Sequence, residues 1–263
     1  MLFAARYFVD SRAFLVALIL PQLVMTRIAC GADISHAESP IEARPDGSIV
    51  TRIKALSSTV QGTERHEEMV FEFGLPAVRP SRQWQEDAHV PVCQSQWHKD
   101  GIRYTEKVLL TRLAPGGLLL DGQPPSDSVL LLQITGENLT NEYTEATAAF
   151  SLKVGSKPLD LELRGDLVYV ILKGLAVPLG SIDVSPSGVL CTNGPQLRFR
   201  GHMPPGSSGA MTIKIPFSKV QEEADFNRVR DLEFEDELTR MKRFWTEHTK
   251  THPKPLFPIK FSQ

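Results

Sequence analysis

Hydrophobic and polar residues alternate through most of the chain from residue 48 to residue 218, which predicts a domain built from β-strands. The clearest case surrounds Lys99-Asp100-Gly101, where the alternating runs 92–97 and 102–113 lie on either side of a turn sequence. Asp-Gly is a strong short-range signal for a tight β-hairpin. We therefore expect two antiparallel strands that meet at this turn.

Other runs repeat the pattern, with turn residues between them about every ten positions. Residues 129–134 are almost wholly apolar, which is typical of a central strand covered on both faces. Further alternating runs lie at 49–55, 69–73, 146–154, 159–163, 167–172 and 211–217. Together with the hairpin strands and the apolar run, they make roughly nine or ten strands. This spacing predicts a mainly β fold, a large antiparallel β-sandwich.

The last regular stretch, 231–250, has helical spacing instead. Its apolar residues recur at steps of four, three and four and form one stripe, which consists of Phe234, Leu238, Met241 and Trp245. Acidic residues crowd its first turn and basic residues its last, as the helix dipole favours. Asp231 can cap the start and Pro253 forbids continuation. We predict one C-terminal amphipathic helix after the sandwich.

Two arrangements of this helix stay open. In the first, it folds back and buries the stripe Phe234, Leu238, Met241 and Trp245 against the sandwich. In the second, the stripe is exposed as an apolar patch and docks a partner, either a helical catalytic domain or another protein.

The N-terminus has the features of a secretory signal peptide. Arg6 and Arg12 precede an apolar run at 13–25, and small residues follow near position 32. The run is shorter than the ~20 residues that a membrane-spanning helix needs. An uncleaved anchor and a lipoprotein acylated at Cys30 are the alternatives. We expect a secreted or periplasmic protein without a stable membrane span after cleavage.

These patterns divide the chain into five segments. They are a signal peptide (1–32), a flexible leader (33–47), the sandwich (48–218), a linker with the helix (219–252) and a tail (253–263). The net charge of −2 and the 41% hydrophobic content are ordinary globular values and give no electrostatic case for nucleic-acid binding.

Candidate metal ligands and cysteines are few. His89 and Cys93 form only a loose pair, whereas a structural zinc site normally has four ligands. We therefore predict no metal and no cofactor. After signal cleavage Cys93 and Cys191 are left, and they form either a disulfide or two separate buried thiols.

Candidate sugar contacts lie in the polar, proline-containing segment 76–91, which we expect to be a loop. Trp84 offers a ring that can stack on a sugar, and Glu86 and Asp87 offer carboxylates. Solvated loop charges are the alternative for both acids. Adjacent residues are also a poor start for a catalytic pair, because neighbours on a strand point to opposite faces. We assign no catalytic residue.

Two further features have competing explanations. Trp97 and Tyr104 either join Trp84 and Tyr143 in an aromatic sugar platform or pack as a cross-strand pair within their hairpin. Asn138-Leu139-Thr140 matches a glycosylation acceptor, which has meaning only where the host's secretory route glycosylates.

A set of aromatic and turn residues recurs in segments spread over the chain: Phe73-Gly74-Leu75-Pro76, Trp84, Pro91 to Trp97, Asp100 to Tyr104, Leu130 to Thr135 with Ala146 to Leu152, Phe234 to Leu238, and Arg243-Phe244-Trp245. Together they resemble the N-terminal region of bacterial secreted glycoside-hydrolase-like proteins of the six-hairpin type. In that family a large β-sandwich is followed by a linker helix and an (α/α)6 barrel.

The resemblance implies a function in carbohydrate binding or degradation. The family's catalytic carboxylates sit mainly in the barrel, which would begin about where this chain ends, after Pro258, so none is carried over. We therefore expect a secreted, non-catalytic sandwich, equivalent to the N-terminal domain of a glycoside hydrolase, with a truncated or split gene product as one origin. An extracytoplasmic interaction module that docks through its helix is the alternative. A stand-alone glycosidase using Glu86 or Asp87 is the third hypothesis.

Overall fold

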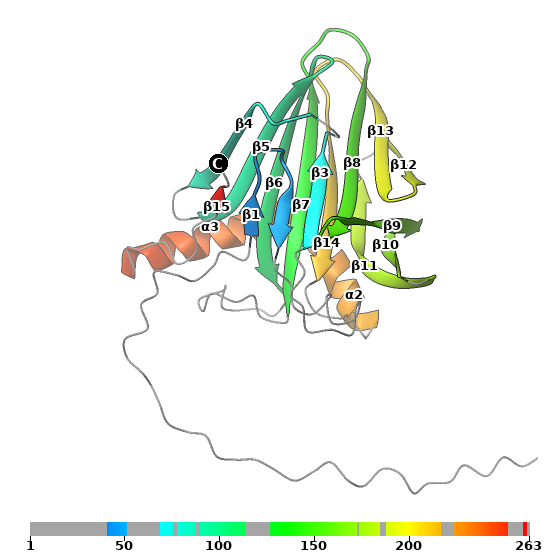
Figure 1. Cartoon of the computed structure of the whole chain (residues 1–263). Coiled ribbons are helices and arrows are strands. Elements are labelled where there is room, and N and C mark those ends of the chain that lie inside the picture. The colour runs from blue at the N-terminus through cyan, green and yellow to red at the C-terminus, as the bar shows by residue number, and fades with distance from the viewer. Residues whose placement is uncertain are drawn as a thin grey trace, which may run out of the picture. The chain divides into compact units, whose positions relative to one another are not determined.

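The computed structural model describes residues 41–51, 69–75, 78–87, 90–113, 127–172, 174–184, 188–216, 223–251 and 260–261 (Figure 1). Contacts divide the chain into two units, Met1–His36 and Ala37–Gln263. All described residues belong to the second unit. The predicted signal peptide at 1–32 lies outside them.

The second unit is mainly β, as predicted. Its described strands are β1 (Ile41–Ala43), β2 (Ile49–Thr51), β3 (Met69–Gly74), β4 (Arg82–Asp87), β5 (Val90–Lys99), β6 (Ile102–Arg112), β7 (Ser128–Asn138), β8 (Thr144–Val154), β9 (Lys157–Arg164), β10 (Leu167–Leu172), β11 (Leu175–Val184), β12 (Gly188–Asn193), β13 (Gln196–Met203), β14 (Ser208–Pro216) and β15 (Lys260–Phe261). They pair in the order β15-β1-β2-β3-β8-β9-β10-β11-β14-β7-β6-β5-β4, and the β12–β13 hairpin joins β8. Among these pairs only β1 with β15 is parallel.

Strand β9 divides this continuous path into two sheets. Its first residues pair with the end of β8, and the rest of the strand pairs with β10. The first sheet contains β1, β2, β3, β8, β12, β13 and β15, and the second runs from β10 through β11, β14, β7, β6 and β5 to β4. β3 contacts β6 and β7 across the space between the sheets (Figure 1). The inward faces of both sheets make one hydrophobic core.

Strand β7 is the central strand that its apolar sequence predicts. Leu130 and Leu132 face the first sheet, Leu131 faces the opposite way, and all three are fully buried. The second face is covered because helices α2 (Glu223–Arg230) and α3 (Phe234–Thr251) lie on the outer side of the second sheet (Figure 1). The short helix α2 is not predicted by the sequence pattern.

The predicted amphipathic helix is confirmed as α3, and its stripe is buried against the protein's own sheet. Phe234, Leu238, Met241 and Trp245 are only 1–3 % exposed. The helix contacts β5 and β6, so the fold-back arrangement is the correct one. Burying a large apolar side chain stabilises a fold by roughly 1.5–3 kcal/mol, which makes the stripe a principal anchor of α3.

The cap predicted for this helix is wrong. The first helical hydrogen bond runs from the Glu237 amide to the Glu233 carbonyl at 3.0 Å, so the helix begins after Glu233. Asp231 lies too early to cap it. Its amide instead donates to the Asn227 carbonyl at 2.9 Å and closes the end of α2.

The carbonyl end of α2 is bound by a buried lysine. Lys214 on β14 is 1% exposed, and its ammonium donates to the Arg230 carbonyl and pairs with Asp183 at 2.6 Å. A cation near the C-terminal carbonyls is stabilised by the helix dipole. Lys214 therefore adds a charged attachment of α2 to the sheet beside the fully buried Val229.

Three stretches expected to be irregular contain strands. The end of the expected leader forms β1 and the turn after it, and Ala43 is fully buried. The expected tail contributes β15, which pairs with β1. The expected loop 76–91 contains the edge strand β4, whose polar residues hide the alternation on which a strand prediction depends.

The predicted hairpin is confirmed in register. Trp97 pairs with Tyr104 across β5 and β6, and the turn places Asp100 at φ 52° and Gly101 at φ 75°, as a type I′ turn requires. Both aromatic residues are buried, at 1% and 3% exposure. The cross-strand explanation of this pair is therefore the correct one.

Candidate functional site

A polar groove of about 430 Å³ lies on the outward side of β3 and β8. The turn between β1 and β2 forms one wall, and the segment after β3 forms another. The polar residues that line it come from separate parts of the chain: Asp46, Ser48, Glu72, Arg79, Ser151 and Gln196. The topology of the first sheet brings them together.

Trp97 holds both walls of the groove in place. Its ring packs against Gly47 and Gly74, whose φ angles are 88° and 122°. A Cβ at these glycines would stand 2.8 Å and 2.9 Å from the ring, so only glycine allows the approach. The indole Nε1 also donates to the Val78 carbonyl at 2.9 Å. One buried side chain therefore fixes the β1–β2 turn and the segment after β3 relative to each other.

Asp46 presents a fixed carboxylate in the first wall. Its Oδ1 accepts hydrogen bonds from the Ser48 amide at 2.9 Å and from the Ser48 hydroxyl at 2.7 Å. Burial raises the pKa of Asp46, but the hydrogen bonds from Ser48 together with the Arg44 charge outweigh it and hold this pKa below its usual range. Asp46 is therefore an ionised acceptor.

The floor of the groove carries a second fixed carboxylate. Glu72 accepts a hydrogen bond from the Ser151 hydroxyl at 2.8 Å and forms an ion pair with Lys153. Gln196 lies opposite Ser151 in the pairing of β13 with β8. Its amide oxygen accepts two bonds from Arg198, at 3.1 Å and 3.0 Å. The floor thus presents oriented polar groups rather than mobile ones.

This arrangement suits recognition of a neutral, hydroxyl-rich ligand. Carboxylates accept strong hydrogen bonds from hydroxyl groups, and Leu75, Val78 and the Trp97 ring supply adjacent apolar surface. Asp46 does not suit a general acid, which needs a raised pKa. Asp46 is therefore better suited to accept hydrogen bonds from a ligand than to donate a proton to it.

The predicted sugar contacts lie on another face. Trp84 and Glu86 are on β4, where Glu86 forms an ion pair with Lys242 of α3. The Arg82 guanidinium lies 4.7 Å from the centre of the Trp84 ring and covers one side of it. The side chain of Asp87 lies outside the described part of the structure. Gln83 of this strand reaches the groove's wall by donating to the Arg44 carbonyl at 2.9 Å.

The two cysteines do not form a disulfide. Cys93 is buried on β5 in the second sheet, and Cys191 is exposed on β12 at the edge of the first, and both are free. Cys93 is a separate buried thiol, as the second alternative predicts, whereas Cys191 is a separate exposed one. Burial raises the pKa of the Cys93 thiol, and the nearby Glu106 adds to this effect.

The structure contains a buried acid that the sequence analysis misses. Glu106 on β6 is fully buried between the sheets, and neither carboxylate oxygen has a hydrogen-bond partner among the described residues. Burial raises the pKa of Glu106 well above its usual range, and the neighbouring Ser95 hydroxyl, which lacks the geometry of a full hydrogen bond, offsets only part of the effect. The alternation of Tyr104, Glu106 and Val108 is the signal that could have placed it inward.

The glycosylation motif is structural in this fold. Asn138 is 1% exposed, and its amide donates to the carbonyls of Glu142, Met203 and Pro204 at 2.7–3.0 Å. Its oxygen accepts the Thr140 amide at 2.9 Å. The nitrogen that a glycan would occupy is already used.

Within the residues that the structure describes, no group of three or more His, Cys, Asp and Glu side chains could hold a metal ion. No helix in those ranges is long and apolar enough to cross a membrane. No known family model matches the chain, and no curated protein matches it. The resemblance to glycoside-hydrolase-like proteins stays a prediction.

Proposed function

We propose that this chain is a secreted, non-catalytic β-sandwich that binds carbohydrate through the polar groove, equivalent to the N-terminal domain of a glycoside hydrolase. The observation that carries the proposal is the pair of oriented carboxylates, Asp46 and Glu72, beside apolar surface. The signal-like N-terminus supports secretion.

The groove has the size and chemistry of a small-molecule site. Its volume of about 430 Å³ falls in the range of roughly 300–1,000 Å³ that is usual for such sites. Sugar hydroxyls need fixed acceptors, which Asp46 and Glu72 supply, and the apolar face of a sugar ring needs a surface such as Leu75 and Val78.

Binding is favoured over hydrolysis because the described acids do not match the needs of a glycosidase. Such an enzyme requires a proton donor of raised pKa in contact with substrate. Asp46 lies in the groove but has a lowered pKa. Glu106 has a raised pKa but lies between the sheets without exposure.

The test is calorimetric titration of the mature protein with a panel of soluble glucans, xylans, mannans and galactans. Gln196→Ala and Asp46→Asn should weaken binding of the best ligand at least ~10-fold, because each removes a polar partner. Arg164→Ala, at the exposed end of β9, is the matched control and should bind normally. Binding to none of the panel would refute the proposal. Loss of binding only in Trp84→Ala would move the site to β4.

The proposal includes a helical catalytic domain as a partner, attached or separate. Its test is the intact mass of the protein purified from its own host after secretion. A mass far above that of residues 33–263 would place catalysis in a further domain. A matching mass, with no associated glycosidase activity, would remove the partner from the proposal.

Docking of a partner through the helix stripe is not favoured by any observation. That function needs Phe234, Leu238, Met241 and Trp245 at the surface, and the sheet covers all of them.

A further inference from the structure

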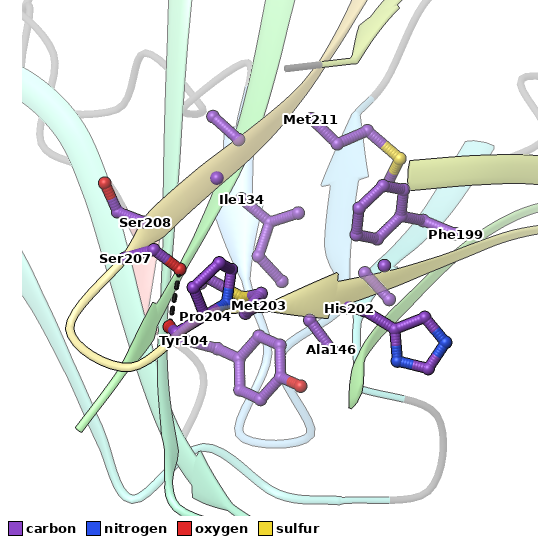
Figure 2. A pocket seen from close by; sticks show the side chains of 15 residues that line it. Tyr104, Ile134, Ala146, Phe199, His202, Met203, Pro204, Ser207, Ser208 and Met211 are labelled. Atoms are coloured by element: carbon purple, nitrogen blue, oxygen red, sulfur yellow. Dashed lines mark hydrogen bonds between the residues drawn. The ribbon is translucent and has the colours of Figure 1, made fainter. Parts of the chain in front are cut away.

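A second pocket lies between the two sheets, and its character is apolar. It has a volume of about 170 Å³ and is lined by residues of β6, β7, β8, β13 and β14 (Figure 2). Its larger side chains are Tyr104, Ile134, Phe199, Met203 and Met211. His202, which is exposed, is the single lining residue with a titratable nitrogen, and it stands at the rim.

The pocket exists because small residues occupy inward positions where the core elsewhere has large ones. Strand register places glycine or alanine on the inner faces of neighbouring strands, at Gly136, Ala146, Ala148, Gly201 and Gly209. Further along the same strand β8, Phe150 and Leu152 fill the space and are fully buried. The sequence therefore leaves a hollow at one end of an otherwise packed core.

Hydrogen bonds fix the distance between the two walls of this hollow. Asn138 at the end of β7 donates to the Met203 and Pro204 carbonyls and so joins β7 to the β13–β14 turn. The Tyr104 hydroxyl accepts the Thr147 amide proton at 3.1 Å and ties β6 to β8. These bonds cross from one sheet to the other. They oppose the collapse by which a core normally closes a void.

The lining favours an aromatic ligand over other apolar groups. Thioether sulfurs such as those of Met203 and Met211 make favourable contacts with aromatic rings, and Phe199 and Tyr104 offer further ring partners. A dry cavity of about 150 Å³ lined by apolar side chains is known to bind benzene, so this slightly larger pocket has room for one ring or for a compact fused pair. We propose that it binds a small, neutral compound with a single aromatic ring system.

The experiment uses the full mature protein with ¹³C-methyl-labelled methionine, titrated with indole and with benzene. Ring currents should shift the Met203 and Met211 methyl signals in a saturable way, and leave the other methionine signals unchanged. Ala148→Leu fills the pocket and should weaken indole binding at least ~10-fold. Ala176→Leu makes the same change on β11, outside the pocket, and should leave it unchanged.

A second variant covers the case in which Ala148→Leu does not fold. Met211→Ala enlarges the hollow and should let anthracene, with three fused rings, bind, which the unaltered protein should reject. The proposal is overturned if neither methyl signal shifts, or if filling and enlarging the pocket leave binding unchanged. It is also overturned if N-acetyl-tryptophanamide binds while indole does not, because the site would then take a peptide side chain. Carbohydrate binding is measured separately, so failure here leaves the groove unaffected.

Discussion

Replacing Glu106 with Gln removes a titrating group from between the sheets while keeping nearly the same shape. Glu106 is fully buried, its oxygens have no hydrogen-bond partner among the described residues, and burial raises its pKa well above the usual range. An isolated charge at such a place is too costly to keep. The folded protein therefore holds this carboxyl protonated at pH values where the unfolded chain ionises it.

The magnitude follows from proton linkage. In the unfolded chain a glutamate ionises near pH ~4.3, so unfolding at higher pH releases one proton and is favoured by about 1.4 kcal/mol per pH unit. The contribution of Glu106 to stability is thus complete below that pH and is lost as the pH rises toward the pKa of the folded state. Gln does not titrate. The stability of the variant relative to the unaltered protein should therefore rise with pH above about 5.5, by up to about 1.4 kcal/mol for each pH unit over which Glu106 stays protonated in the folded state.

Urea unfolding of both proteins across this pH range measures the difference directly. Glu142→Gln, in the exposed β7–β8 turn, is the matched control, and its difference from the unaltered protein should stay flat. A Glu106→Gln difference that does not change with pH would refute the reasoning. It would mean that Glu106 is ionised in the folded protein and has a partner.

Other predictions concern the framework, and urea or thermal unfolding checks each of them. Asn138→Ala removes the donor to the buried Met203 carbonyl and to the partly buried carbonyls of Glu142 and Pro204 and should cost about 2–4 kcal/mol; a loss under ~0.5 kcal/mol would contradict its structural role. Gly74→Ala forces a Cβ to 2.9 Å from the Trp97 ring at a φ of 122° and should cost at least ~2 kcal/mol, whereas Gly165→Ala, in open space, should cost about 1 kcal/mol. Equal losses would count against the ring contact. Trp245→Ala empties a buried site under α3 and should cost about 3–5 kcal/mol, and an unchanged midpoint would show that the helix is not held by its stripe.

Local patterns predict the parts of this fold that depend on neighbours in sequence. The Asp100-Gly101 turn determines its hairpin because two residues of positive φ are needed there. The apolar run in β7 indicates a strand whose two faces are both buried. The β12–β13 hairpin carries a related turn signal, Gly194-Pro195 with Gly194 at φ 58° in the first turn position, together with alternation through Leu197 and Phe199, and it could have been found.

Pairings between distant segments are not predictable in this way. Alternation gives the face on which a residue lies and not the strand beside it. The pairing of β1 with β15 joins residues from the two ends of the second unit, and no local pattern marks it. The same limit left the covering of the helix stripe open.

The candidate site is hidden for the same reason. Glu86 reads as a loop carboxylate, but its partner Lys242 lies on a helix far along the chain. Asp46, Glu72 and Gln196 come from separate strands and turns and converge only when the first sheet forms. Composition can therefore indicate sugar-binding residue types without showing which of them share a groove.

Strand β9 has a consequence for how the protein comes apart. Because it hydrogen-bonds to β8 at one end and to β10 along the rest, the sheets are joined by backbone as well as by side-chain contacts. Separating them on that side requires breaking peptide hydrogen bonds, so neither sheet opens there alone. Amides of β8 and β10 should consequently exchange with solvent through the same global opening, with equal protection free energies.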